Sequence, residues 1–362
     1  MRRRGAALPV ALLLLALLGA LAGLVLVASR VRVLAGARAL DHARLEAAAR
    51  GAIEWHLFQW AQVHPDTLAV GATAPLVPPA WAGVPLAGTL TRTGQAGFLL
   101  AVTAERRAAD GGILARSSAG QLVRLTGAAS PDTAALVAFG PVTLLDSVRV
   151  SGIDSLPATS WAPACPPPAP PQPGVRSRLA TADCPGGGCA AGAPPLLLDS
   201  AVAPAATYPL GPHTVATLRA SADLRLPAGL LSPAPATSGA DCDRSQPTNW
   251  GDPDTVAAPC SGWFPVVEVT DGGVVVGGVG QGILLGAGRL TLGGGLRFVG
   301  LVLALGPLEL RDSVRVAGQV IGLDSVRVGD DVSLRWSACA AMMSGTNSAR
   351  PIPGSGRWFL GH

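Results

Sequence analysis

An uncharged and largely apolar stretch near the amino terminus places the strongest limit on how this chain folds. It runs for 24 residues from Ala6 to Ser29 and follows three consecutive arginines, Arg2 to Arg4. As a helix, a stretch of that length crosses about 30 Å of hydrocarbon, and the preceding arginines favour a cytoplasmic amino terminus. We therefore expect a single-pass protein of the cytoplasmic membrane whose C-terminal body lies in the periplasm or at the cell surface.

The apolar stretch continues into a segment rich in alanine, leucine and arginine that ends at His64-Pro65. The two together predict one helix from Ala6 to Val63. Small and apolar side chains, with one arginine, recur every three or four residues along one side of it: Leu34, Ala37, Leu40, Arg44, Ala47 and Ala48. Such a stripe suits close helix packing in a fibre or docking onto the protein's own sheet, and both remain open.

Three interpretations of the first thirty residues remain open. Ala20-Leu21-Ala22 would serve as a signal peptidase site, although cleavage there would discard half of the apolar segment. A plain membrane anchor is the second interpretation. The third depends on Gly5, which ends the basic leader directly before the apolar helix and admits an extended backbone into a protease cleft.

A short basic leader that ends in glycine before a long apolar helix resembles the signal of bacterial type IV pilins and type II secretion pseudopilins. The resemblance implies that a prepilin peptidase cleaves between Gly5 and Ala6, and that the mature helix packs against other pilin-like subunits. The glutamate common at the fifth mature position in those families is replaced here by Val10. We therefore expect a minor subunit, similar to PilX-type minor pilins or a tip pseudopilin, instead of a bulk fibre subunit.

The exported part predicts a mainly β structure, because aromatic residues are few while the chain has 46 glycines and 32 prolines. An internal repeat is the most informative feature. "GPVTLLDSVRVSG" (140–152) aligns with "GPLELRDSVRVAG" (306–318), and "DSVRV" recurs at 324–328. Short alternating runs separated by glycine or aspartate fit a parallel β-solenoid, in which each rung packs on its neighbours. An antiparallel sandwich is the rival architecture.

These features give a predicted organisation of five parts. A leader occupies residues 1–5, the transmembrane and amphipathic helix 6–64, a small β region 65–138, the β-solenoid 139–341 and a tail 342–362. The copy at 140–152 is expected to be an early rung. Residues 153–265, rich in proline, glycine and cysteine, are expected to form a mostly irregular excursion from the solenoid.

Six cysteines lie on the exported side, and their even number suits an oxidising compartment: Cys165, Cys184, Cys189, Cys242, Cys260 and Cys339. Fifteen pairings are possible. Residues close in sequence, such as Cys184 with Cys189 and Cys242 with Cys260, are candidates to staple the excursion.

The body also resembles exported proteins that carry a PilX-like amino terminus. The shared stretches are "NWGDP" (249–253), "CSGWFP" (260–265), "GQGILL" (280–285), the strand-rich run after it, and "SACA" (337–340). This resemblance covers about the first sixty residues and residues 249–341. It implies pilin-like assembly and gives no activity common to the family.

Chemical sites are weakly indicated. "GGVGQG" (277–282) lacks a following helix to hold phosphate, so turn glycines explain it better than nucleotide binding. Four aspartates close in sequence form a weak calcium candidate: Asp241, Asp243, Asp252 and Asp254. The repeated Asp146, Asp312 and Asp324 are expected to cap turns. No set of residues predicts catalysis, and no cofactor is indicated.

Charge gives no support to nucleic acid as a partner. All 27 basic residues are arginines, and without Arg2 to Arg4 the remaining 24 face 23 acidic residues, a net charge of about +1. We expect a non-enzymatic pilin-like minor subunit that acts in fibre assembly, priming or tip display. The alternative is a membrane-anchored surface β-solenoid that binds polysaccharide or cell wall, and a solenoid enzyme is a third, weaker option.

Overall fold

The computed structural model divides the chain into two compact units, Met1–Arg124 with Pro351–His362, and Leu125–Arg350. Gly5, Ala6, Asp146 and Cys184 lie outside the residues that it describes. The described residues are 7–60, 68–78, 81, 83–94, 97–145, 147–158, 161, 165, 167–180, 189–254, 258–270, 272–345, 348, 350–353 and 359–361.

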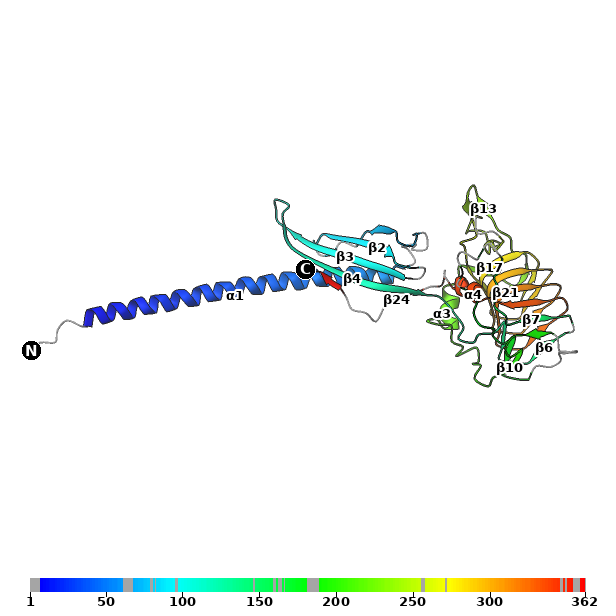
Figure 1. The fold of residues 1–362 in the computed structure, drawn as a ribbon. Helices are drawn as coiled ribbons and strands as arrows, with labels where there is room; N and C mark the ends of the chain where they lie inside the picture. Colours follow the sequence, from blue (N-terminus) through cyan, green and yellow to red (C-terminus); the bar gives the residue numbers. More distant parts are fainter. Residues whose placement is uncertain are drawn as a thin grey trace, which may run out of the picture. The chain divides into compact units, whose positions relative to one another are not determined.

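The predicted amino-terminal helix is confirmed as α1, Ala7–Phe58, which is long and apolar enough to cross a membrane (Figure 1). Residues 61–63 of the predicted helix lie outside the described residues. Residues 11–40 are exposed throughout, including Leu13, Leu24 and Leu26 at 69%, 69% and 70%. Within the described residues of this unit, no other segment packs against the exposed leucines and valines of this part of α1.

The last third of α1 packs on the protein's own sheet. Small side chains let the helix approach closely. Its buried positions are Leu45, Ala48, Ala49, Ala52, Ile53 and His56, and Trp60, just after the helix, is buried as well. The Trp60 ring meets the Phe98 ring edge-on, with the centroids 5.4 Å apart. Of the stripe predicted from Leu34 to Ala48, only Ala48 is buried. Docking therefore uses a different face, and most of the predicted stripe stays exposed.

The sheet under α1 is antiparallel and begins as a meander of β1 (Thr73–Leu76), β2 (Leu86–Arg92), β3 (Gly97–Arg107) and β4 (Ile113–Thr126). α1 contacts β3. Two strands from the carboxyl end, β24 (Arg350–Pro353) and β25 (Phe359–Gly361), also pair with β4. Residues 342–362 therefore include part of this sheet, and the small β region extends to Thr126 instead of residue 138.

The second unit is a β-solenoid, and every strand pairing between its rungs is parallel, which excludes the antiparallel sandwich there. Its larger sheet contains β5 (Leu136–Ala138), β7 (Arg149–Ser151), β8 (Val175–Ser177), β9 (Ala190–Ala191), β10 (Leu196–Leu198), β11 (Leu224–Leu226), β15 (Val266–Val269), β17 (Val279–Gly286), β19 (Arg297–Ala304), β21 (Arg315–Gly322) and β23 (Ser333–Trp336). Its smaller sheet contains β6 (Val142–Leu144), β12 (Gly229–Leu231), β16 (Gly273–Val276), β18 (Leu290–Gly293), β20 (Leu308–Leu310) and β22 (Val326–Val328).

The order of the rungs along the solenoid differs from the order in the chain. The strands β5, β6 and β7 pair with β21, β22 and β23, so the copy at 140–152 stacks against the last rung. β8 and β10 then extend the stack away from that junction, and the chain returns to start again with β11 and β12 at the other end. The predicted excursion at 153–265 therefore contributes rungs of its own, although most of its described residues lie outside strands and helices, as predicted.

One period of the sequence repeat corresponds to one rung of the solenoid. The register partners Val279, Arg297, Arg315 and Ser333 follow one another at intervals of 18 residues. The copy of "DSVRV" at 312–316 leads into β21 in the larger sheet, whereas the copy at 324–328 contains β22 in the smaller sheet. Those two copies are thus not structurally equivalent, although they have the same sequence.

Apolar clusters on both faces of the larger sheet hold the solenoid together. The interior between the sheets stacks apolar side chains from successive rungs, such as Phe298, Val316, Leu334 and Val150. A second cluster covers the outer face of the larger sheet, where Leu301 and Leu303 pack with Tyr208 and Leu210. The connection that returns the chain to the far end, which includes α3 (Val215–Ala220), thus closes the sheet from outside. Burying both faces matches the continuous apolar runs of these strands.

Candidate binding groove

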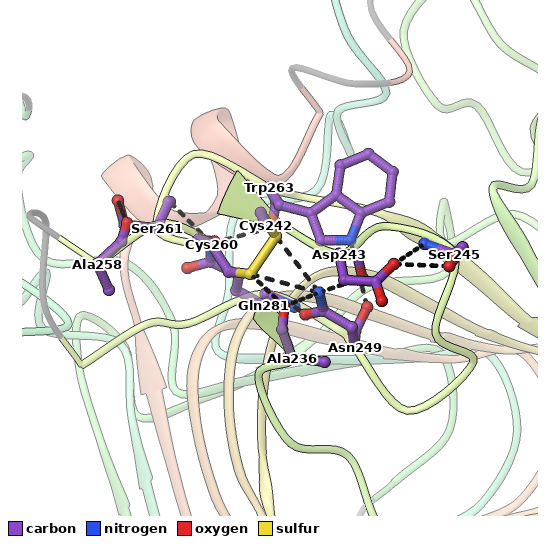
Figure 2. The surroundings of a disulfide bond; sticks show 11 residues. Ala236, Cys242, Asp243, Ser245, Asn249, Ala258, Cys260, Ser261, Trp263 and Gln281 are labelled. Atoms are coloured by element: carbon purple, nitrogen blue, oxygen red, sulfur yellow. Dashed lines mark hydrogen bonds between the residues drawn. A yellow bond between two sulfur atoms is a disulfide. The ribbon is translucent and has the colours of Figure 1, made fainter. Parts of the chain in front are cut away.

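Three of the motifs that linked the body to exported pilin-like proteins, "NWGDP", "CSGWFP" and "GQGILL", supply residues around the disulfide between Cys242 and Cys260, and this disulfide confirms that pairing (Figure 2). A short hairpin, β13 (Thr237–Ser238) and β14 (Asp241–Cys242), carries the first cysteine. Asn249 is fully buried beside the disulfide. Its Nδ2 donates to the carbonyl oxygens of Ala236 at 3.0 Å and Asp243 at 2.7 Å, and its Oδ1 accepts from the Gly251 amide at 3.1 Å.

Gln281, on the outer face of the larger sheet, completes this cluster. Its Nε2 donates to the carbonyl oxygens of Cys260, Ser261 and Trp263 at 3.2, 2.8 and 3.0 Å. Buried amides that satisfy loop carbonyls stabilise a loop that has no strand partner. The cluster therefore stabilises the fold of the described residues 236–254 and 258–263. "GQGILL" lies in β17, while Gly277 and Gly278 form the preceding turn with φ of +82° and +93°.

The four aspartates of the calcium candidate do not converge. Within the described residues, no group of three or more histidine, cysteine, aspartate or glutamate side chains is placed to hold a metal ion. Asp243 accepts from Ser245 and Gln246, and these hydrogen bonds, with Ser245 first, lower the pKa of its carboxyl. Asp252 caps the Asp254 amide, and Asp254 pairs with Arg297 at 2.5 Å.

The remaining cysteines tie distant segments. Cys165 bonds to Cys339 across a sequence separation of 174 residues, with Cα atoms 5.4 Å apart. Cys339 lies on α4 (Ala338–Ser344), a short helix over β19 and β21. Cys189 is also disulfide-bonded, and Cys184, its expected partner, lies outside the described residues. The pairing of Cys165 with Cys339 had no signal in the sequence, because only the fold brings these residues together.

A groove of about 920 Å³ runs across the rungs on the larger sheet near its strand starts. Its floor includes the small apolar side chains of Val299 and Ala317. Polar side chains of the described chain that line it are Ser147, Arg149, Asp254, Arg297, Ser313, Arg315, Asp331, Ser333 and Arg335. Four arginines against two aspartates give this groove a net positive charge.

Three of the arginines belong to one column of the sheet. Arg297 and Arg315 are direct register partners, Arg315 pairs next with Ser333, and Ser333 pairs with Arg149. Arg335 follows two residues after Ser333 and therefore faces the same side of the sheet. All four arginines are exposed. Within the described part of the chain, Arg297 has Asp254 as its ion-pair partner, whereas no ion pair joins Arg149, Arg315 or Arg335 to an acidic side chain.

Sequence reasoning missed this groove. The signal was present, since the arginines of "LRFVG" and "SVRVAG" are 18 residues apart and the arginine of the 146–150 copy occupies the same place in its repeat. The sequence interpretation assigned aspartates of the repeat to turns and gave its arginines no role. Ser325 donates its backbone amide to Asp324 Oδ1 at 2.6 Å, which confirms the turn role of Asp324. Asp312 lies in a turn with a φ of +57°.

Comparisons with known proteins add one structural likeness. Scans against models of protein families and against curated proteins give no match. The solved structure of the competence-associated pilin ComZ from Thermus thermophilus is similar at 13% sequence identity, with 88% of this chain and 97% of that chain covered and a TM-score of 0.25. A score this low leaves the functional argument to the chain's own residues.

Proposed function

We propose that this chain is a pilin-like minor subunit of a type IV pilus or type II secretion machine. In this proposal α1 inserts the subunit into a membrane-assembled fibre, and the solenoid is displayed outside the cytoplasmic membrane for priming, tip capping or surface contact. The observation that carries the proposal is the division of α1 into an exposed part, residues 11–40, which is uncharged up to Ser29, and a part buried under the protein's own sheet. Apolar surface of that extent indicates a lipid or protein partner.

The exposed stripe supports helix packing between subunits. Leu34, Ala37 and Leu40 lie beyond the uncharged stretch that ends at Ser29, so lipid need not cover them. They are exposed because docking onto the sheet uses Leu45, Ala49 and other residues instead. Small residues at three- and four-residue spacing let neighbouring helices approach closely. We assign this stripe to contacts with other pilin-like subunits.

Processing by a prepilin peptidase is part of the same proposal. Cleavage between Gly5 and Ala6 would remove all three leader arginines and leave α1 at the mature amino terminus. The test is mass spectrometry of the mature amino terminus from cells with and without the peptidase. A chain beginning at Ala6 only in the presence of the peptidase supports the proposal. A chain beginning at Gly23, or one that keeps Arg2 to Arg4, overturns it.

The proposed role involves no catalysed reaction. The motif residues Asn249 and Gln281 use their buried amide groups to hold loop carbonyls, which favours a structural role for the most distinctive part of the body. The replacement of the pilin glutamate by Val10 favours a minor subunit. We therefore propose a mechanical function that depends on helix packing and on what the solenoid contacts.

The alternative is a membrane-anchored surface solenoid that binds polysaccharide or cell wall without entering a fibre. The arginine-lined groove favours this candidate, because a solenoid that binds a ligand at the cell surface requires attachment to the membrane but no assembly into a fibre. The two candidates differ in what surrounds α1. A subunit should co-purify with sheared fibres or assembly complexes, whereas an anchored solenoid should remain with the membrane fraction after shearing.

A further inference from the structure

We propose that the groove along Arg297, Arg315, Arg149 and Arg335 binds an extended acidic glycan through the carboxylates of its uronic acid residues. The inference concerns the solenoid unit alone. It goes beyond the proposed minor-subunit function, which names no ligand, and it gives a chemical class to the polysaccharide of the alternative candidate. The placement of two arginines on register partners lowers the stability of the sheet. Like charges on register partners of neighbouring strands destabilise a sheet, and Arg297 and Arg315 are such partners.

The opposite sheet of the same solenoid shows the usual arrangement. There the outward column runs through Thr291, Glu309, Arg327 and Thr143, so the glutamate and the arginine are register partners. The arginine column on the larger sheet has no such acidic register partner. The two columns belong to the same rungs, so the repeat itself does not require arginines that lack an acidic partner. A bound anion would supply the missing negative charge beside Arg315 and Arg149.

The spacing suits a polymer that lies across the rungs. Neighbouring strands are about 4.8 Å apart, so Arg315 and Arg149, two rungs apart, are separated by about 10 Å along the solenoid. In a β-1,4-linked polymannuronate, whose equatorial linkages give an extended chain, alternate rings present their carboxylates on the same side, at an interval of two pyranose rings. Guanidinium groups bind carboxylates through two parallel hydrogen bonds. The column thus presents guanidiniums at an interval suited to successive same-side carboxylates.

The other lining groups distinguish a glycan from a nucleic acid. Asp331 and the hydroxyls of Ser313 and Ser333 can accept hydrogen bonds from sugar hydroxyls. The phosphodiester backbone of DNA has no hydroxyl donors to offer them. The one aromatic residue among the described lining residues, Phe298, is 1% exposed, so no ring is available there for base stacking.

The test uses the full-length chain in detergent micelles and three probes of matched length. These are a 1,4-linked oligomannuronate, a neutral 1,4-linked oligomannoside, and a single-stranded DNA oligonucleotide with the same number of charges. The oligomannuronate should bind, the neutral oligomannoside should not bind, and the DNA should bind more weakly than the oligomannuronate. Absence of oligomannuronate binding, or DNA binding of equal or greater affinity, would overturn the inference.

Matched variants locate the site. Arg149→Gln, Arg315→Gln and Arg335→Gln together should weaken oligomannuronate binding by about tenfold or more, because charge-assisted hydrogen bonds are lost. Arg327→Gln, on the smaller sheet, should leave the affinity unchanged. If the triple variant fails to fold, Arg315→Gln alone provides the same comparison with a smaller loss. An equal effect of Arg327→Gln would show non-specific attraction and contradict the inference. Neither result bears on cleavage after Gly5, so the two proposals fail separately.

Discussion

Gly300 and Gly318 are register partners on β19 and β21, and a Cβ atom on Gly318 would lie 1.9 Å from the carbonyl oxygen of Gly300. The same relationship joins Gly300 to Gly282, at 2.1 Å. Their φ angles are +141°, +133° and +102° for Gly318, Gly300 and Gly282. This column of glycines lets successive rungs bend in the same place while their backbones stay in contact.

Replacing a glycine of this column should disrupt the stack. We expect Gly318→Ala to lower the free energy of unfolding by about 3 kcal/mol or more, because its Cβ meets backbone that cannot move aside. Urea denaturation of the solubilised protein, followed by tryptophan fluorescence, measures the effect. Gly295→Ala is the control, since Gly295 also has a positive φ but open space around its Cβ, and it should cost about 1 kcal/mol. Equal losses in the two variants would contradict the steric explanation.

The turn before β21 should become more stable when its second residue is glycine. Ser313 has a φ of +64°, and Gly295 holds the equivalent position one rung earlier with a φ of +76°. Ser313→Gly should therefore raise the free energy of unfolding by about 0.5 to 1 kcal/mol, because it removes the strain of a left-handed serine. The reverse change, Gly295→Ser, should lower it by a similar amount. A loss of stability in Ser313→Gly would count against this account of the turn.

The Asn249 amide should be essential for the loop that holds the Cys242–Cys260 disulfide. In Asn249→Asp, a carboxylate oxygen replaces Nδ2 and faces the carbonyl oxygens of Ala236 and Asp243. We expect the free energy of unfolding to fall by about 3 kcal/mol, because buried acceptors lose their donor. Asn249→Asp at low pH, where the carboxyl is protonated, should recover part of that loss. Wild-type stability in this variant at neutral pH would contradict the structural role.

Tyr208, the single tyrosine of the chain, should ionise only above the ordinary tyrosine range. Burial raises the pKa of its phenol, which contacts Ser130 Oγ at 2.6 Å and donates to Asp132 Oδ2 at 3.1 Å. Because the folded-state pKa lies above the unfolded value of about 10, its contribution to stability is present below that pH and is lost as the pH rises through the folded pKa. Tyrosinate absorbance during an alkaline titration reports this group alone, and Tyr208→Phe supplies the blank. Ionisation near pH 10 in the folded protein would contradict the placement.

The parts of the fold that could be predicted are those that depend on the pattern of neighbouring residues in the sequence. The uncharged stretch from Ala6 to Ser29 gave the helix, and the repeated short runs gave a parallel solenoid. The order of the rungs was not predictable, because "SVRV" at 147–150 and at 313–316 have the same local preferences whichever rung they join. Stacking against β23 decides the place of β7, and it depends on segments far away in the chain.

The candidate groove was missed for a related reason. An arginine that alternates with valine predicts an exposed position on a strand, and nothing in one rung shows whether the next rung supplies an opposite charge. The register partner of Arg327 on the neighbouring strand is Glu309, whereas that of Arg315 is Arg297. Only the register between rungs distinguishes these two arginines, although both occur in the sequence "DSVRV".

The central claim is that α1 packs against the helices of other pilin-like subunits through its exposed stripe. A photo-crosslinking amino acid in place of Ala37, in cells that carry the assembly machine, tests it most directly, with the same substitution at Ala49 as the control. Ala37 is exposed, whereas Ala49 is fully buried under the protein's own sheet. We predict a covalent adduct with a second pilin-like subunit from position 37 and none from position 49. The absence of any protein adduct from position 37 would contradict the account and leave an anchored solenoid.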